Sequence, residues 1–219
     1  MRYLAIIFLS SILSLAPFSV KATAQEPDLI IVDGKTHSLN TNPLSSYLIE
    51  NPNLLPKTEY QRTSNWRGYT ATWAIQGDQL FLNRVEMRFP NPDKESRKPI
   101  EKDVLPQLFP TSAPVPAIWY TGALIIPDGE QVEYAHMGYG STYSHYLIFR
   151  IEAGKVIERL ALDQKAFENY RLKKFKAYTK TSDFKSTFSD LKKRIGGGMS
   201  DTQLLQFMSE FYSEQYLAQ

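Results

Sequence analysis

Two histidines, His136 and His145, stand on either side of a segment rich in glycine and tyrosine. If the flanking segments pair as antiparallel strands with their apolar side chains on one face, the register places His136 opposite His145. That register follows from two apolar pairs, Val132 with Phe149 and Tyr134 with Leu147. Directly opposed residues have Cβ atoms roughly 4.5–5.5 Å apart. Two imidazoles at this separation can share a metal ion or contact a ligand, and they can equally be structural residues at a strand end.

The segment between the histidines favours a surface that contacts a ligand or a partner. Tyrosine combines apolar area with a hydroxyl group, which suits such surfaces. Arg67 is a further candidate, because a guanidinium beside Trp66 at the start of a predicted strand can bind an anion or cover the indole ring. The candidate contact residues are Tyr134, His136, Tyr139, Ser141, Tyr143, His145 and Arg67.

No residue pattern is strong enough to assign a catalytic group, a metal site or a cofactor. The chain has no cysteine, which excludes thiol nucleophiles and thiolate metal ligands. The sequence Gly138-Tyr-Gly-Ser141 lacks the spacing and the lysine of a phosphate-binding loop, and the G-x-S-x-G pattern is absent. The enzymatic alternative is a hydrolase that uses His136 or His145 with Ser141 and a carboxylate such as Asp128.

The start of the chain predicts export. Residues 1–24 contain a positively charged start, an apolar run and the small-residue site Ala22-Thr-Ala24, which is the pattern of a cleavable signal peptide. The apolar run is interrupted by serines and Pro17 and is short for a membrane span. We therefore expect a mature protein that begins at Gln25, lies in the periplasm or outside the cell, and has no span after cleavage.

Charge argues against a nucleic-acid partner. The mature chain carries 23 basic and 23 acidic residues once Arg2 and Lys21 leave with the signal. Lysines gather between residues 165 and 194, but the aromatic residues among them recur at helical spacing and suit a buried helix face better than base stacking.

The elements that would position these residues fall into a β-rich unit, residues 28–162, and a helical tail, residues 163–219. Alternating apolar residues predict hairpins at 28–39 and 69–89, and further strands at 118–126, 132–136, 143–151 and 155–162. Pro127-Asp-Gly129 predicts a turn between the strands at 118–126 and 132–136. Seven prolines between Pro90 and Pro116 predict a long irregular excursion with one turn near 103–108. Helical periodicity returns at 163–178 and 183–195, and Ser200-Asp-Thr-Gln203 predicts a capping box that opens a last helix. The fold class expected is α+β: an antiparallel meander or small barrel-like sheet with C-terminal helices packed on it, in a single domain from 25 to 219.

Several of these motifs together resemble a group of uncharacterised bacterial proteins. The resemblance covers about residues 28–162 and rests mainly on Trp66-Arg-Gly-Tyr-x-Ala-Thr-Trp73 and His136-Met-Gly-Tyr-Gly-Ser141. It implies that this stretch forms one unit. No activity is established for that group, so the resemblance gives no catalytic role to any residue.

Three classes of function remain open at this point. The first is an exported, non-catalytic protein that binds a protein partner, such as a toxin or an enzyme of the envelope. The second is a carrier of a small apolar ligand inside a barrel lined by Trp73, Trp119, Tyr134 and His145. The third is the hydrolase described above.

Overall fold

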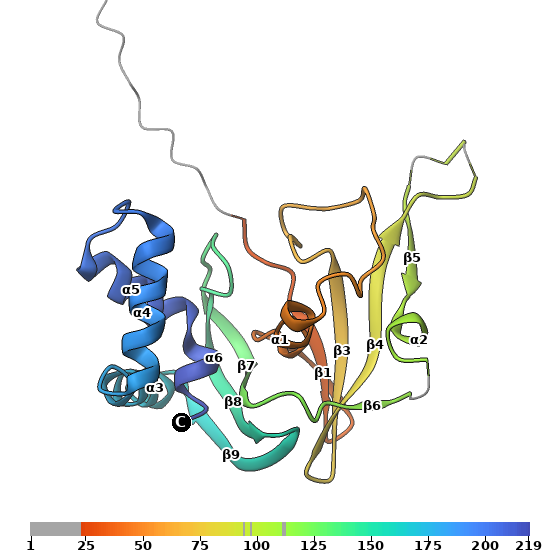
Figure 1. Cartoon of the computed structure of the whole chain (residues 1–219). Coiled ribbons are helices and arrows are strands. Elements are labelled where there is room, and N and C mark those ends of the chain that lie inside the picture. The colour runs from red at the N-terminus through yellow and green to blue at the C-terminus, as the bar shows by residue number, and fades with distance from the viewer. Residues whose placement is uncertain (1–22, 94, 97, 111–112) are drawn as a thin grey trace, which may run out of the picture.

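The computed structural model describes residues 23–219 except for 94, 97, 111 and 112, so the predicted signal peptide lies almost entirely outside the described residues. In the described part, nine strands form one mixed sheet and six helices accompany it, four of them in the C-terminal tail (Figure 1). The predicted α+β class is confirmed. The strands are β1 (Asp28–Val32), β2 (Lys35–Leu39), β3 (Tyr69–Gln76), β4 (Gln79–Phe89), β5 (Ile100–Asp103), β6 (Val115–Pro116), β7 (Gly122–Glu133), β8 (Thr142–Glu152) and β9 (Lys155–Asp163). The helices are α1 (Pro43–Glu50), α2 (Leu105–Leu108), α3 (Gln164–Tyr178), α4 (Ser182–Ile195), α5 (Asp201–Phe211) and α6 (Ser213–Tyr216).

The sheet is open, in the strand order β2-β1-β3-β4-β9-β8-β7. All neighbouring strands are antiparallel except β1 and β3, which pair in parallel. One half of the sheet contains β1 to β6 and the other contains β7 to β9. Strands β4 and β9 join these halves through one residue pair, Gln79 with Lys155, and diverge from that point. At the opposite end, the Asn40 N–H donates to the Ile125 carbonyl at 2.8 Å, which brings the edge strands β2 and β7 together without closing a barrel.

Strand β7 is longer than the sequence predicts, and this changes the register of the histidines. Asp128-Gly129 was expected to be a turn, but the chain continues as one strand through a bulge at this point. Gly129 has a φ of +83°, a conformation that favours glycine and suits a bulge as well as a turn. The predicted register is therefore wrong: His145 lies opposite Asp128, and His136 lies beyond the end of β7.

The proline-rich excursion contains more regular structure than expected. The predicted turn is present as α2, but β5 and β6 also pair with β4, in registers Glu86 with Asp103 and Leu82 with Val115. Each added strand is only two to four residues long, which is compatible with prolines on either side.

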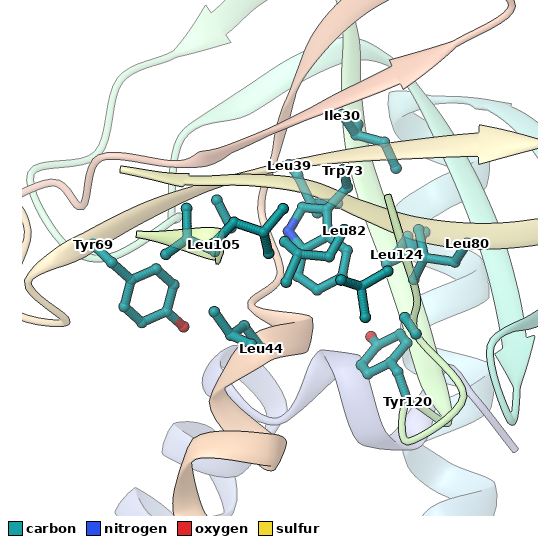
Figure 2. Close-up of a cluster of buried hydrophobic side chains, with 14 of the residues drawn as sticks. Ile30, Leu39, Leu44, Tyr69, Trp73, Leu80, Leu82, Leu105, Tyr120 and Leu124 are labelled. Atoms are coloured by element: carbon teal, nitrogen blue, oxygen red, sulfur yellow. The ribbon is translucent and has the colours of Figure 1, made fainter. Parts of the chain in front are cut away.

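Two hydrophobic cores lie on opposite faces of β7 and β8. Leu124 and Ile126 face the first core, which surrounds Trp73 and is shown in Figure 2. Ala123 and Ile125 face the second core, where the helical tail packs against the sheet. Alternate residues of one strand are thus buried on both faces, which explains why residues 122–127 are all apolar or glycine. None of the helices in the described part is both long and apolar enough to cross a membrane.

Candidate binding site

A cavity of about 630 Å³ lies where the helical tail meets the first half of the molecule. We call it the interface cavity. Its walls come from Gln25, the segment between β2 and α1, the residues before β3, strands β7 and β8 with the loop between them, and helices α3, α5 and α6. The lining includes Gln25, Thr41, Asn42, Trp66, Arg67, Ile125, Ala135, Met137, Gly138, Tyr139, Ser141, Thr142, Phe167, Arg171, Glu210, Phe211 and Glu214.

On the sheet side, Arg67 is held by a fully buried carboxylate, that of Asp28. Arg67 Nη1 lies 3.2 Å from Asp28 Oδ1, and the exposed fractions of the two side chains are 4 % and 0 %. The other carboxylate contacts come from strand β3: the Ala71 N–H donates to Oδ1 at 3.0 Å, and the Trp73 indole N–H donates to Oδ2 at 3.1 Å. The Arg67 Nη2 group donates to the Glu26 carbonyl at 2.7 Å. This network fixes the guanidinium at the cavity wall.

The charges of this pair depend on each other. Burial raises the pKa of the Asp28 carboxyl, while the nearby Arg67 charge and the donors of Ala71 and Trp73 act in the opposite direction. Burial acts to lower the pKa of Arg67, but the charge and hydrogen bond of Asp28, together with Tyr139 and Tyr69, act in the opposite direction and leave that pKa raised. A guanidinium is protonated at any physiological pH, so Arg67 is a permanent cation in this wall.

A second polar cluster connects the floor of the cavity to the tail. Tyr139 O–H donates to Asn42 Oδ1 at 2.8 Å, and the Asn42 N–H donates to Glu214 Oε2 at 3.3 Å. Glu214 is the only one of these three residues that belongs to the tail, where it is the second residue of α6. Its carboxylate therefore ties the tail to the N-terminal end of α1.

Burial favours the neutral forms of both acidic groups in this cluster. It raises the pKa of the Glu214 carboxyl, against the opposing effect of hydrogen bonds from Tyr120 and the Asn42 N–H. It also raises the pKa of the Tyr139 phenol, so this tyrosine keeps its proton and donates it to Asn42.

On the helix side, Arg171 of α3 presents a second guanidinium. Its Nε donates to Tyr216 O–H at 3.2 Å and its Nη2 donates to the Ser209 carbonyl at 2.9 Å. The guanidinium carbon also lies 5.7 Å from the centre of the Phe167 ring. These contacts orient Arg171 but leave its Nη1 N–H groups free of any protein acceptor in the described part of the chain.

Two side-chain hydroxyl groups of lining residues, Thr41 Oγ1 and Thr142 Oγ1, are buried without a hydrogen bond that meets the distance and angle of a good one among the described residues. Buried polar groups in proteins nearly always have a hydrogen-bond partner. Thr41 and Arg67 have almost no exposed side-chain surface. Both threonines belong to the lining of the cavity, although their hydroxyl groups are shielded from solvent.

Apolar side chains form the rim of the cavity. Trp66, Met137 and Phe211 are 69 %, 47 % and 42 % exposed, and each comes from a different wall. Gly138 allows two of these walls to meet, because a Cβ at this position would lie 3.2 Å from the Phe211 ring. The Gln25 N–H donates to the Gly138 carbonyl at 3.0 Å, so the start of the predicted mature chain also lies at this rim.

Three of the seven predicted contact residues, Arg67, Tyr139 and Ser141, line the interface cavity together. Ser141 Oγ accepts a hydrogen bond from the Ala135 N–H at 3.0 Å and so shapes the loop between β7 and β8. All three stand in segments where glycine lies beside aromatic or hydroxyl side chains.

The other four predicted residues lie outside the cavity. Tyr134 and His136 contact each other on the exposed segment after β7, with Tyr134 O–H 3.1 Å from His136 Nδ1. Tyr143 packs edge-on against Tyr146 beside the second core. His145 is exposed on β8, and its Nδ1 lies 3.1 Å from Ser144 Oγ.

Among the described residues, no hydrogen bond links Ser141 to His136 or His145. No group of three metal-ligating side chains is present there. The hydrogen bond recorded for Ser141 Oγ is with the Ala135 N–H rather than with an imidazole. Asp128 lies opposite His145, but its Oδ1 is 3.8 Å from His37 Nδ1 on β2.

Sequence reasoning missed the residues that the tail and the strand ends supply: Asp28, Thr41, Asn42, Thr142, Arg171 and Glu214. Arg171 and Glu214 stand in amphipathic helical stretches, where a charged residue is typical of a solvated face. One weak signal was available for Asn42, since Asn42-Pro43 marks the start of a helix.

The barrel lined by Trp73, Trp119, Tyr134 and His145 is not present. Trp73 is fully buried in the first core, whereas Tyr134 and His145 are exposed. The cavity lies between the sheet and the tail instead. Comparisons with known proteins add nothing to this geometry: no family model, no curated protein and no solved structure matches the chain.

Proposed function

We propose that this chain is an exported, non-catalytic protein that binds a small molecule in the interface cavity. The observation that carries the proposal is one cavity whose wall combines apolar side chains with the guanidinium groups of Arg67 and Arg171. A volume of about 630 Å³ is typical of sites for small ligands. Export follows from the sequence pattern of residues 1–24.

The first experiment is native mass spectrometry of the mature protein, purified gently from the cells that export it. We expect a chain that begins at Gln25 with an added mass of a few hundred daltons, the size of ligand that such a cavity holds. A mass that includes residues 1–24 would contradict export with cleavage.

A cavity-filling variant tests where the molecule binds. Ala135→Trp places an indole at the half-buried wall of the cavity, whereas Ala177→Trp places the same side chain on the exposed face of α3. The fluorescent probe N-phenyl-1-naphthylamine should bind the wild type and the Ala177 variant, and its affinity should fall at least about tenfold in the Ala135 variant. Equal binding by both variants would exclude the cavity as the site.

A protein partner remains the second candidate, because an exposed apolar strip follows the bulge in β7. Val132, Tyr134 and Met137 are 57 %, 57 % and 47 % exposed, and single exposed residues are common but a run of three is less so. A photo-crosslinking amino acid at Tyr134 should give a discrete adduct in the exporting cells. The same group at Leu172, which is 65 % exposed on α3, serves as the control, and no adduct specific to Tyr134 would remove this candidate.

A further inference from the structure

The charges around the interface cavity are unequally balanced. The carboxylate of Asp28 lies 3.2 Å from the guanidinium of Arg67, so this cation has its counter-charge inside the protein. Arg171 is in no ion pair among the described residues, since its two recorded acceptors are a phenol oxygen and a backbone carbonyl. Arg171 is therefore a cation of the lining whose guanidinium contacts only neutral acceptors among the described residues.

None of the acidic residues near Arg171 among the described residues forms an ion pair with it. Glu210 also lines the cavity, but it is exposed and its Oε1 accepts a hydrogen bond from Gln206 Nε2 at 3.1 Å. Glu168, three residues earlier on α3, is exposed and its Oε1 accepts from Gln164 Nε2 at 3.1 Å. Glu214 accepts from the Asn42 N–H, and burial raises the pKa of its carboxyl, which favours the uncharged form.

Arg171 is also positioned before any ligand arrives. Two of its donors are fixed on Tyr216 and Ser209, and Tyr216 O–H itself donates to the Ser209 carbonyl at 2.8 Å. A guanidinium held in this way can offer its remaining N–H groups to an acid group without a further loss of side-chain freedom. Hydrogen bonds in which both partners are charged are about twice as strong as neutral ones.

The remaining wall is apolar. Ile125 of β7 and Phe167 of α3 belong to the second core and line the cavity, and Phe211, Met137 and Trp66 continue this apolar surface to the rim. An apolar body of a ligand would replace water against these side chains.

We infer that the ligand of the interface cavity is an amphipathic organic anion, whose acid group binds Arg171 and whose apolar body lies against Ile125, Phe167 and Phe211. This inference rests on the proposed function of the cavity. It names a chemical class, an acid head on an apolar body, and leaves carboxylates and phosphate esters to be distinguished by experiment.

The test uses two probes that differ by one charged group. 8-Anilinonaphthalene-1-sulfonate is N-phenyl-1-naphthylamine with an added sulfonate, so the ratio of their affinities measures the contribution of the anion. We expect the wild type to bind the sulfonate probe more tightly, and Arg171→Gln to weaken it about tenfold or more with little effect on the neutral probe. Lys173→Gln removes the same charge from an exposed position two residues away and should change neither affinity.

Competition distinguishes the sources of the acid group. Decanoate and decyl phosphate should each displace the sulfonate probe, whereas decanol, with the same chain and no charge, should displace it at least about tenfold less well. The more effective of the two acids identifies the head group. Equal displacement by decanol would overturn the inference.

The failures of the two proposals are separable. If neither probe binds the wild type, the proposed function fails and the inference falls with it. If the neutral probe binds but Arg171→Gln leaves the ratio of affinities unchanged, only the anion inference fails. Arg171→Lys, which keeps the charge but loses the planar fork, provides the test if the glutamine variant does not fold, and it should give an intermediate affinity for the sulfonate probe.

Discussion

The Asp28 network and the interface cavity are two buried polar regions that meet at Arg67, and they differ in how well their groups are satisfied. Asp28 has no exposed surface, yet its two oxygens meet the Ala71 N–H, the Trp73 indole and the Arg67 guanidinium. Thr41 and Thr142, which line the same cavity as Arg67, have buried hydroxyl groups with no partner in the described structure.

The difference separates a structural role from a binding role. A fully satisfied network in a packed core makes one arrangement of the chain more stable than its alternatives. Unpartnered groups beside a cavity weaken the free protein and become favourable only when something else supplies their hydrogen bonds. The two regions should therefore respond in opposite ways when their polar groups are removed.

The largest effect is expected from Asp28→Ala. The change leaves Arg67 as a buried, unpaired cation and deprives the Trp73 indole of its acceptor, so the free energy of unfolding should fall by about 3–5 kcal/mol. Urea denaturation measures it. The control Glu86→Ala breaks an ion pair with Arg84 in which the side chains are 30 % and 52 % exposed, and should cost less than about 1 kcal/mol. Similar losses in both variants would contradict a structural role for the network.

A smaller, pH-dependent effect is expected from Glu214→Gln. The ordinary pKa of glutamate is 4.5, and burial raises the pKa of Glu214 in the folded protein, so the folded state binds more protons than the unfolded state above pH 4.5. The free energy of unfolding should therefore fall as the pH rises from 4.5 through the raised pKa. Glutamine keeps an oxygen acceptor for the Asn42 N–H but cannot ionise, so the variant should lose this part of the pH dependence. Denaturation curves with the same slope against pH in both proteins would contradict burial of the carboxylate.

The next pair of changes compares a satisfied hydroxyl with an unsatisfied one. Ser45 Oγ lies 3.1 Å from Tyr69 O–H, and Ser45→Ala should cost about 0.5–1.5 kcal/mol of stability. Thr142→Val removes a buried hydroxyl without a partner and preserves the shape of the side chain, so it should be neutral or stabilise the free protein by about 1 kcal/mol. Thermal unfolding of the two variants measures the difference in sign. A loss of stability in Thr142→Val would show that its hydroxyl has a partner after all.

Most strands and helices of this fold were predictable because neighbouring residues in the sequence determine them. The hairpin at β3 and β4 follows from alternating side chains on either side of Gly77-Asp78, and the capping box at Ser200 is present with both of its hydrogen bonds. Asp128-Gly129 gave a wrong prediction because the same dipeptide serves a turn or a bulge, and only pairing with β8 decides between them.

The site was only partly predictable for a related reason. Arg67, Tyr139 and Ser141 stand in short segments whose composition is unusual, and the sequence identifies them. Arg171 and Glu214 reach the cavity only because the tail packs on the second core and α6 meets the start of α1. Contacts of this kind depend on how helices dock, and helical periodicity does not determine which charged residue on a helix faces a cavity.

The smallest effect on stability is expected at the rim of the interface cavity, where a residue can contribute to binding without contributing to stability. Trp66 is 69 % exposed and Ile118, outside the cavity lining, is 67 % exposed, so Trp66→Ala and Ile118→Ala should each change the free energy of unfolding by less than about 0.5 kcal/mol. Their effects on binding should differ: Trp66→Ala removes an aromatic wall and should weaken the neutral naphthylamine probe roughly threefold to tenfold, whereas Ile118→Ala should leave its affinity unchanged. Fluorescence titration of the two variants measures the difference in probe affinity. Equal affinities in the two variants would remove Trp66 from the site. An exposed residue that contributes to binding and not to stability belongs to the site rather than to the fold.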